Sequence, residues 1–141
     1  MATDNSAVSG NASSGGTWTT YTPTFTGFGT LVSQFVQYLV DGNDLLVRAQ
    51  FVSGTTTTTE ARMSLPTGRT SAATIVTIAF TGMAERSDPG GTYHNTVLIE
   101  TSKTYLTFGQ NDGGNSGLTK RNADDMGTDQ TWSFTARIPL A

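Results

Sequence analysis

The sequence contains no cysteine and a single histidine, and only 13% of its 141 residues are charged. Without cysteine, disulfide bonds and thiolate metal sites are both excluded. The charged fraction is about half of the usual ~25%, and the formal net charge is -3. A nucleic-acid-binding protein needs clustered basic residues to displace counterions, whereas the basic residues here are scattered, apart from Lys120 and Arg121. We therefore expect no nucleic acid partner.

Long apolar runs are also absent. None approaches the roughly 20 residues needed to span a bilayer, and residues 1–16 have neither the basic region nor the apolar region of a secretory signal. We therefore expect no membrane partner. Residues 2–16 are small and polar, with Val8 as their only sizeable apolar side chain, so residues 1–16 cannot bury enough surface to offset the entropy of ordering. They predict a flexible N-terminal arm, which either has no role or becomes ordered on a partner.

Threonine is abundant, at close to a fifth of the chain, and its β-branched side chain favours strands. From Trp18 onward the apolar residues recur with a period of two. The alternation is clearest in residues 44–52 and 130–139, where Leu45, Val47, Ala49 and Phe51, and Trp132, Phe134, Ala136 and Ile138, occupy one face. Both segments predict half-buried strands. Similar but shorter patterns place further strands at 18–26, 33–40, 59–65, 73–81, 92–100 and 103–109.

Turn residues separate these strands. Asp41–Asp44 predicts a tight hairpin, because Gly42 and Asn43 tolerate the positive φ that such turns require. About eight short strands in a chain of single-domain length predict an all-β fold, which we expect to be a jelly-roll-like antiparallel β-sandwich over residues 17–141. The run Thr55–Thr59 is read as a strand edge or turn. Residues 109–127 form a long polar loop and are a candidate contact surface.

No catalytic constellation emerges from the sequence. His94 is the one histidine and lies in a strand segment, where we expect a surface or interface side chain, and no nucleophile-elbow motif accompanies it. A loop group of carboxylates could bind Ca²⁺ as hard oxygen ligands, namely Asp112, Asp124, Asp125 and Asp129. Their spacing does not match an EF-hand, so a solvated loop is favoured. We expect no enzyme activity, no cofactor and no metal.

Two apolar groups are candidates for contact with a partner protein or for self-association, together with Val8. The first is Trp18, Tyr21, Phe25 and Phe28. Such rings can stack on sugars, but core or subunit-interface packing is favoured, with Phe28 held in a turn between two glycines. The second is Val76, Ile78 and Phe80, which alternate with Ile75 and Ala79, so that both faces of this strand are predicted to be buried, as at a subunit interface.

Three segments carry a family resemblance: TWTTYTPTFTGFGT at 17–30, DGNDLLVRAQFVSGTTTTTEARMSLPTG at 41–68, and WSFTARIPL at 132–140. Together they resemble a module that recurs in virion proteins of tailed bacteriophages, including capsid decoration (cement) proteins, head fibres and tail-fibre tips. The resemblance covers most of residues 17–141, although residues 73–127 are only loosely patterned.

The resemblance implies a structural virion protein on the outer surface of the capsid, present in the host cytoplasm before assembly. Its expected partners are the major capsid protein and copies of itself, with a homotrimer favoured and a homodimer at a capsid two-fold as the alternative. The module follows the start of the chain within about 17 residues, without the anchoring region and shaft of a tail fibre. This favours a cement protein that bridges capsid subunits, with its arm across their seams.

The alternative function is a receptor- or glycan-binding tip of a tail fibre or head fibre. Its contact surface would include the 109–127 loop and a set of polar and aromatic residues, namely Tyr93, His94, Asn115, Lys120 and Arg121. Under this alternative alone, a host-surface glycan would be a partner.

Overall fold

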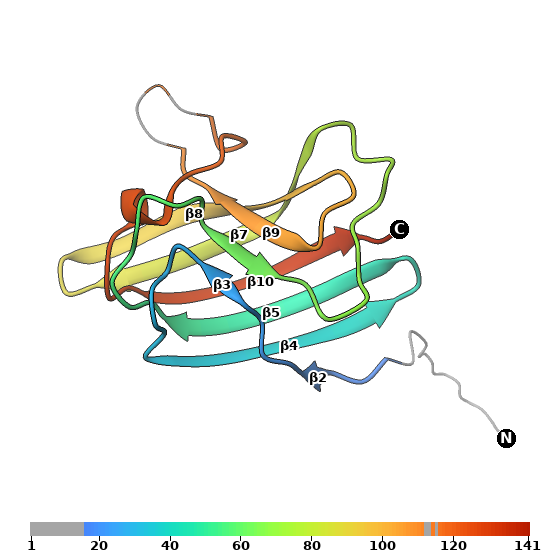
Figure 1. Ribbon diagram of the computed structural model, residues 1–141, viewed down its shortest axis with the longest axis horizontal. Coiled ribbons are helices and arrows are strands. Elements are labelled where there is room, and N and C mark those ends of the chain that lie inside the picture. Colours follow the sequence, from blue (N-terminus) through green and yellow to red (C-terminus); the bar gives the residue numbers. More distant parts are fainter. Residues whose placement is uncertain (1–15, 112–113, 115) are drawn as a thin grey trace, which may run out of the picture.

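The computed structural model describes residues 16–111, 114 and 116–141, so Val8, Asp112, Asn115 and nearly all of the predicted arm lie outside the described residues (Figure 1). The all-β prediction is confirmed. The strands are β2 (Thr19–Thr20), β3 (Phe25–Thr26), β4 (Ser33–Asp41), β5 (Asp44–Val52), β6 (Arg62–Ser64), β7 (Ile78–Asp88), β8 (Gly91–Glu100), β9 (Tyr105–Gly109) and β10 (Thr131–Pro139), with a short 3₁₀ helix, η2 (Ala123–Met126), before β10.

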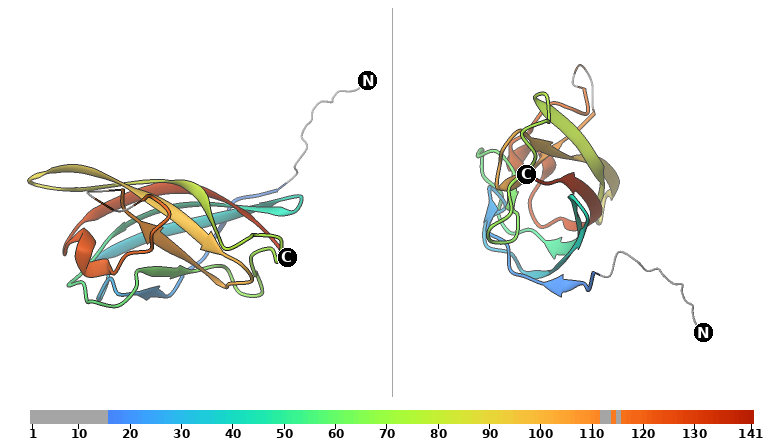
Figure 2. Two further views of the ribbon diagram at one scale, coloured as in Figure 1. Left: turned by 90° about the horizontal axis from the view of Figure 1, so that it is seen from above. Right: turned by 90° about the vertical axis from the view of Figure 1, so that its right-hand side faces the viewer.

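All strand pairs are antiparallel and belong to one sheet, in the order β2-β4-β5-β10-β7-β8-β9-β6-β3. The sheet curls until its two ends meet, as the end-on view in Figure 2 shows. One segment joins those ends, because β2 pairs with β4 at one edge and β3, only a few residues later, pairs with β6 at the other. The division into the two sheets of a jelly-roll sandwich stays a prediction.

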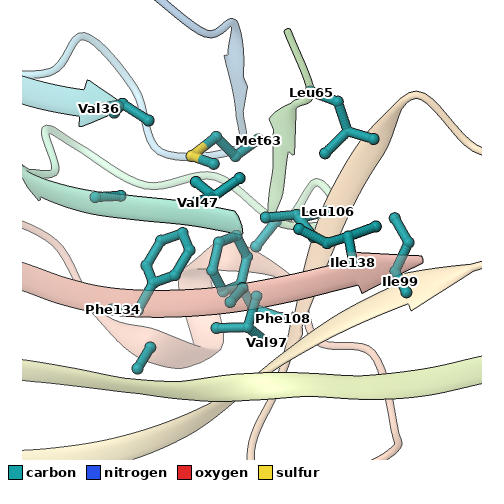
Figure 3. Close-up of a cluster of buried hydrophobic side chains, with 14 of the residues drawn as sticks. Val36, Val47, Met63, Leu65, Val97, Ile99, Leu106, Phe108, Phe134 and Ile138 are labelled. Carbon is teal, nitrogen blue, oxygen red and sulfur yellow. The ribbon is translucent and has the colours of Figure 1, made fainter. Parts of the chain in front are cut away.

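An aromatic cluster fills the centre of the curled sheet. The Phe28 ring lies edge-on to Phe51, Phe108 and Trp132, with centroid distances of 5.3, 5.6 and 5.6 Å, and Trp132 stacks on Phe51. Aliphatic side chains from the facing strands extend this core, among them Val36, Val47, Met63, Val97, Ile99, Leu106 and Ile138 (Figure 3). The half-buried strands predicted from the period of two are therefore confirmed for β5 and β10, since every second side chain of both strands points into the core.

Glycines allow two loops to cross in contact at one end of the core. A Cβ on Gly29, whose φ is +68°, would lie 2.2 Å from the carbonyl oxygen of Thr55, and a Cβ on Gly54 would lie 2.1 Å from that of Thr30. The Gly54 and Thr57 amides donate to the carbonyls of Phe28 and Gly27. The threonine run is thus a loop that is held by backbone contacts, and Thr56 is its buried side chain. The predicted Asp41–Asp44 hairpin is confirmed, with Gly42 at a φ of 62°.

The strand predicted at 73–81 is displaced. β7 begins at Ile78 and continues to Asp88, where the Asp88 carboxylate accepts hydrogen bonds from the Gly90 and Gly91 amides and closes the β7–β8 hairpin. The faces near Val76 are not both buried within this chain, and their burial at a subunit interface stays a prediction. Val76 precedes the strand and is 97% exposed. Phe80 is 54% exposed, since strand alternation turns it away from the face of Ala79, which packs against the core. Ile75 alone of this group is buried.

Candidate contact surface

Five adjacent strands, β4, β5, β10, β7 and β8, present their outward side chains on one face. Strand register places Phe35 opposite Gln50, Gln50 opposite Ser133, Ser133 opposite Glu85, and Glu85 opposite His94. These side chains form a row that crosses all five strands. We call the surface around this row the outer face. It lies on the opposite side of the sheet from the aromatic core.

Neutral polar side chains dominate the outer face. Thr131 and Thr135 flank Ser133 on β10, and Arg48 and Gln50 alternate with the buried residues of β5. Arg48 donates two hydrogen bonds to the Oε1 of Gln37, at 2.9 and 2.6 Å, and its guanidinium lies 4.1 Å from the centroid of the Trp18 ring. Arg48 is therefore held flat against the strands.

Several large apolar side chains are exposed on or beside this face. Phe35 on β4 is 50% exposed, Met83 on β7 is 49% exposed, and Phe80 and Val76 follow along β7 and the loop before it. A hollow of about 440 Å³ lies between β5, β10 and β7, and Trp18, Leu46 and Met83 are among its lining residues. The outer face thus combines an apolar part on its β7 side with a polar part around Phe35.

The predicted aromatic group does not form one site. Phe25 and Phe28 pack together in the core, with ring centroids 5.8 Å apart. Tyr21 lies edge-on to Tyr38 at 5.5 Å, and Trp18 lies outside, on the Arg48 guanidinium. Phe28 is fully buried, as expected of a turn residue that packs inward. Only Trp18 of the four therefore contributes a ring, partly buried, to the outer face.

Tyr93 and His94 point to opposite sides of β8. His94 lies on the outer face, with its Nε2 3.4 Å from a carboxylate oxygen of Glu85. The Tyr93 ring instead lies 4.5 Å from the guanidinium carbon of Arg86, which is buried. Strand alternation separates the two side chains, so they do not form one contact patch.

Arg86 is the centre of a buried polar network beneath the β7–β8 hairpin. Its Nε donates to the Oδ1 of Asn95 at 2.8 Å, and its Nη1 donates to the Oε1 of Gln130 at 3.2 Å. Gln130 in turn donates to the Asp88 carboxylate at 2.9 Å. Burial lowers the pKa of Arg86, and the Gln130 and Gly90 donors lower the pKa of Asp88. The network connects the hairpin to the residue just before β10, Gln130, and its role is structural.

Lys120 and Arg121 are engaged within the chain. The Lys120 Nζ lies 3.1 Å from Glu60 and 2.9 Å from Glu100, and these carboxylates, Glu100 foremost, raise the pKa of Lys120. Arg121 pairs with Asp125 at 3.3 Å. Lys120 therefore fixes this part of the 109–127 loop against β8 and against the segment before β6, while Arg121 pairs with a carboxylate of η2. Both side chains are engaged within the chain.

Within residues 16–111, 114 and 116–141, no group of three or more histidine or acidic side chains is positioned to hold a metal ion. The described residues also contain no helix long and apolar enough to cross a membrane. Comparison with protein-family models, with curated proteins and with solved structures found no match.

Sequence reasoning missed Phe35 and Met83 as exposed apolar residues. In β4 both alternating sets are apolar or large, since Phe35 and Leu39 interleave with Val36, Tyr38 and Val40, so periodicity could not decide which set faces outward. Met83 follows a β-bulge between Phe80 and Gly82, which shifts the alternation of β7. Only the register of the strands in the folded sheet shows that Phe35 and Met83 both face outward.

Proposed function

We propose that this chain is a non-catalytic structural protein of a tailed-bacteriophage particle, a decoration (cement) protein that coats the capsid. It stabilises the shell by bridging major capsid protein subunits. The observation that carries the proposal is the group of exposed apolar side chains along β7 and the loop before it: Val76, Phe80 and Met83. Exposed apolar patches of this kind mark protein–protein contact sites.

The surroundings of these side chains have the composition of an interface. Protein interfaces are enriched in aromatic residues, methionine and arginine, and charged residues other than arginine are depleted at their centres. The hollow beside Met83 is lined by Trp18, Leu46 and Arg48, among others. A side chain of a partner subunit that entered this hollow would be shielded from water, which is the condition under which a few residues supply most of the binding energy.

The family resemblance supports the scaffold of this proposal more than its contact surface. The three segments that carry it supply Phe28, Phe51 and Trp132, which meet in the aromatic core. The exposed side chains of β7 lie instead in the loosely patterned part of the sequence. A shared core with variable outer strands is what is expected when one module serves different positions on virus particles.

Weak contacts would be sufficient for stable attachment, because each oligomer carries several copies of the contact surface. Each copy needs only modest affinity, because a homo-oligomer that contacts several shell subunits at once gains from multivalency. A closed homotrimer is the form we favour, with a homodimer as the alternative, since most oligomers close with point-group symmetry. The fold suits such mechanical work because its sheet closes on itself through residues 19–26.

Reconstitution on capsids tests the proposal. Heads of the phage that encodes this protein, prepared without it, should rupture at a lower temperature and regain stability when purified protein is added. Met83→Asp and Phe80→Asp should abolish this rescue, whereas Thr92→Asp, at an exposed position of the adjacent strand β8, should preserve it.

Two results would overturn the proposal. The first is that the protein does not bind such heads or leaves their rupture temperature unchanged. The second is that the isolated protein binds host cells and blocks infection, which would favour the fibre-tip alternative.

A further inference from the structure

A second part of the outer face has a chemistry unlike that of the β7 patch. Two hollows, of about 380 and 330 Å³, lie on either side of the half-exposed Phe35 ring on the surface of β4, β5 and β10. Phe35, Gln50 and Ser133 line both hollows. Phe35 therefore stands as a ridge between two depressions that share a polar floor.

The lining of these hollows includes neutral hydrogen-bonding side chains that have no partner among the described residues. Among the described residues, the side chains of Gln50, Thr131, Ser133 and Thr135 make no hydrogen bond. Elsewhere in the sheet, threonine hydroxyls are used internally: Thr81 donates to the carbonyl of Val97 and Thr107 donates to that of Ala61. The groups around Phe35 thus retain their full hydrogen-bonding capacity for a ligand.

We propose that the surface around Phe35 is a binding site for a neutral saccharide. A pyranose ring has an apolar face of C–H groups, which packs on an aromatic ring, and a rim of hydroxyls, which exchange hydrogen bonds with carboxamides and hydroxyls. Phe35 supplies the ring, and Gln50, one strand away in direct register, supplies a planar carboxamide that both donates and accepts. Ser133, in register on the next strand, continues the polar floor for a second sugar unit.

The charges on the face define the class of saccharide. Glu85 lies in register beside Ser133 and would repel a carboxylate or sulfate group on the ligand. Arg48 lines the second hollow and keeps its positive charge, since the side chain to which it donates, Gln37, is neutral. The two nearest charges thus have opposite signs, and a ligand without net charge matches them.

This site adjoins the proposed capsid contact, because Arg48 and Thr135 line both the Met83 hollow and the second Phe35 hollow. The apolar side chains at the centre of each surface are different: Phe35 lies on β4, whereas Met83 and Phe80 lie on β7, with β5 and β10 between them. One shallow site of this size should bind in the millimolar range, which corresponds to about 4 kcal/mol. Many copies on one particle would raise the effective affinity through multivalency.

Saturation-transfer NMR on the purified, full-length protein tests the inference, with cellotetraose, maltotetraose and chitotriose as probes at about 10 mM, above the expected dissociation constant. At least one probe should receive saturation from the protein. Phe35→Ala should reduce this transfer at least about tenfold, the equivalent of about 1.4 kcal/mol, and Phe35→Trp should restore or strengthen it. Gln50→Ala should weaken binding while leaving the fold unchanged, as judged by near-ultraviolet circular dichroism.

Phe80→Ala is the matched control, because Phe80 is an equally exposed phenylalanine on the same sheet. It should leave saccharide binding unaltered. Saturation transfer that survives Phe35→Ala, or the absence of transfer to all three probes, would overturn the inference. Because the measurement uses the isolated protein, neither outcome bears on the capsid proposal.

Discussion

The phenol of Tyr21 donates a hydrogen bond to the carbonyl oxygen of Ser64 at 3.0 Å, while the backbone amide of the same residue donates to the carbonyl of Val36, also at 3.0 Å. Val36 belongs to β4 and Ser64 to β6, near opposite ends of the strand order. One residue therefore bonds both ends of the sheet. The segment from β2 to β3 closes the curled sheet, and the two hydrogen bonds of Tyr21 hold it in place.

Loss of the phenol should loosen this closure. Tyr21→Phe removes the donor and leaves the Ser64 carbonyl partly buried without its partner, so the free energy of unfolding should fall by about 1–2 kcal/mol. Chemical denaturation of the two proteins measures the difference. Tyr105→Phe is the control, because the Tyr105 hydroxyl makes no hydrogen bond with the described residues, and it should change stability little. Equal effects of the two substitutions would contradict the role given to Tyr21.

Alkaline pH should weaken the wild-type protein through the same residue. Burial, assisted by the neighbouring Tyr38, raises the pKa of Tyr21 well above its ordinary value. The folded state thus favours the protonated phenol, and its contribution is fully present below about pH 10, the ordinary tyrosine pKa, and is lost as the pH rises above that value. Urea unfolding at about pH 8 and about pH 11 should show this loss in the wild type and a smaller loss in Tyr21→Phe.

The aromatic core should be far more sensitive to truncation than the outer face. Phe28→Ala leaves a cavity bordered by Phe51, Phe108 and Trp132, and we expect a loss of about 3–5 kcal/mol. Phe80→Ala, at a half-exposed position, should stay within about 1 kcal/mol of the wild type. Thermal unfolding followed by circular dichroism measures both. A small effect at Phe28 would contradict the central position of this ring.

Acid should destabilise the β7–β8 hairpin. Donors from Gln130 and from the Gly90 and Gly91 amides hold the pKa of Asp88 below its ordinary value. Its contribution to stability is therefore present above about pH 4 and is lost as the pH falls through that value towards the lower pKa of the folded state. Asp88→Asn should flatten this part of the stability profile between about pH 5 and about pH 3. If the free energy of unfolding of the variant falls with pH as steeply as that of the wild type, the prediction is contradicted, and other carboxylates such as Glu60 cause the acid sensitivity.

Local patterns were sufficient to predict the strands that are buried on one side only. β5 and β10 were located to within a residue, because each alternates apolar and polar side chains over its full length. The Asp41–Asp44 turn followed from the conformational freedom of Gly42. The β7 strand was displaced because its N-terminal half is apolar on both faces, so the alternation that should have marked its start was absent.

The contact surface depended on information that no local pattern holds. Phe35 and Val36 are adjacent and both apolar, and only the pairing of β4 with β5 turns the first outward and the second into the core. Lys120 and Arg121 resembled a free basic pair, yet Glu60 and Asp125 neutralise them in the folded chain. Tyr93 and His94 resembled one patch, yet strand alternation places them on opposite faces.

The sequence by itself determined the all-β class, the core faces of the regular strands and the tight turn, because these depend on alternation and backbone freedom over a few residues. Tertiary structure decided the closure of the sheet by Tyr21, the row from Phe35 to His94 and the exposure of the β7 side chains. Those features depend on register between strands that are distant in the chain, and register is fixed only when all the strands pack around one core.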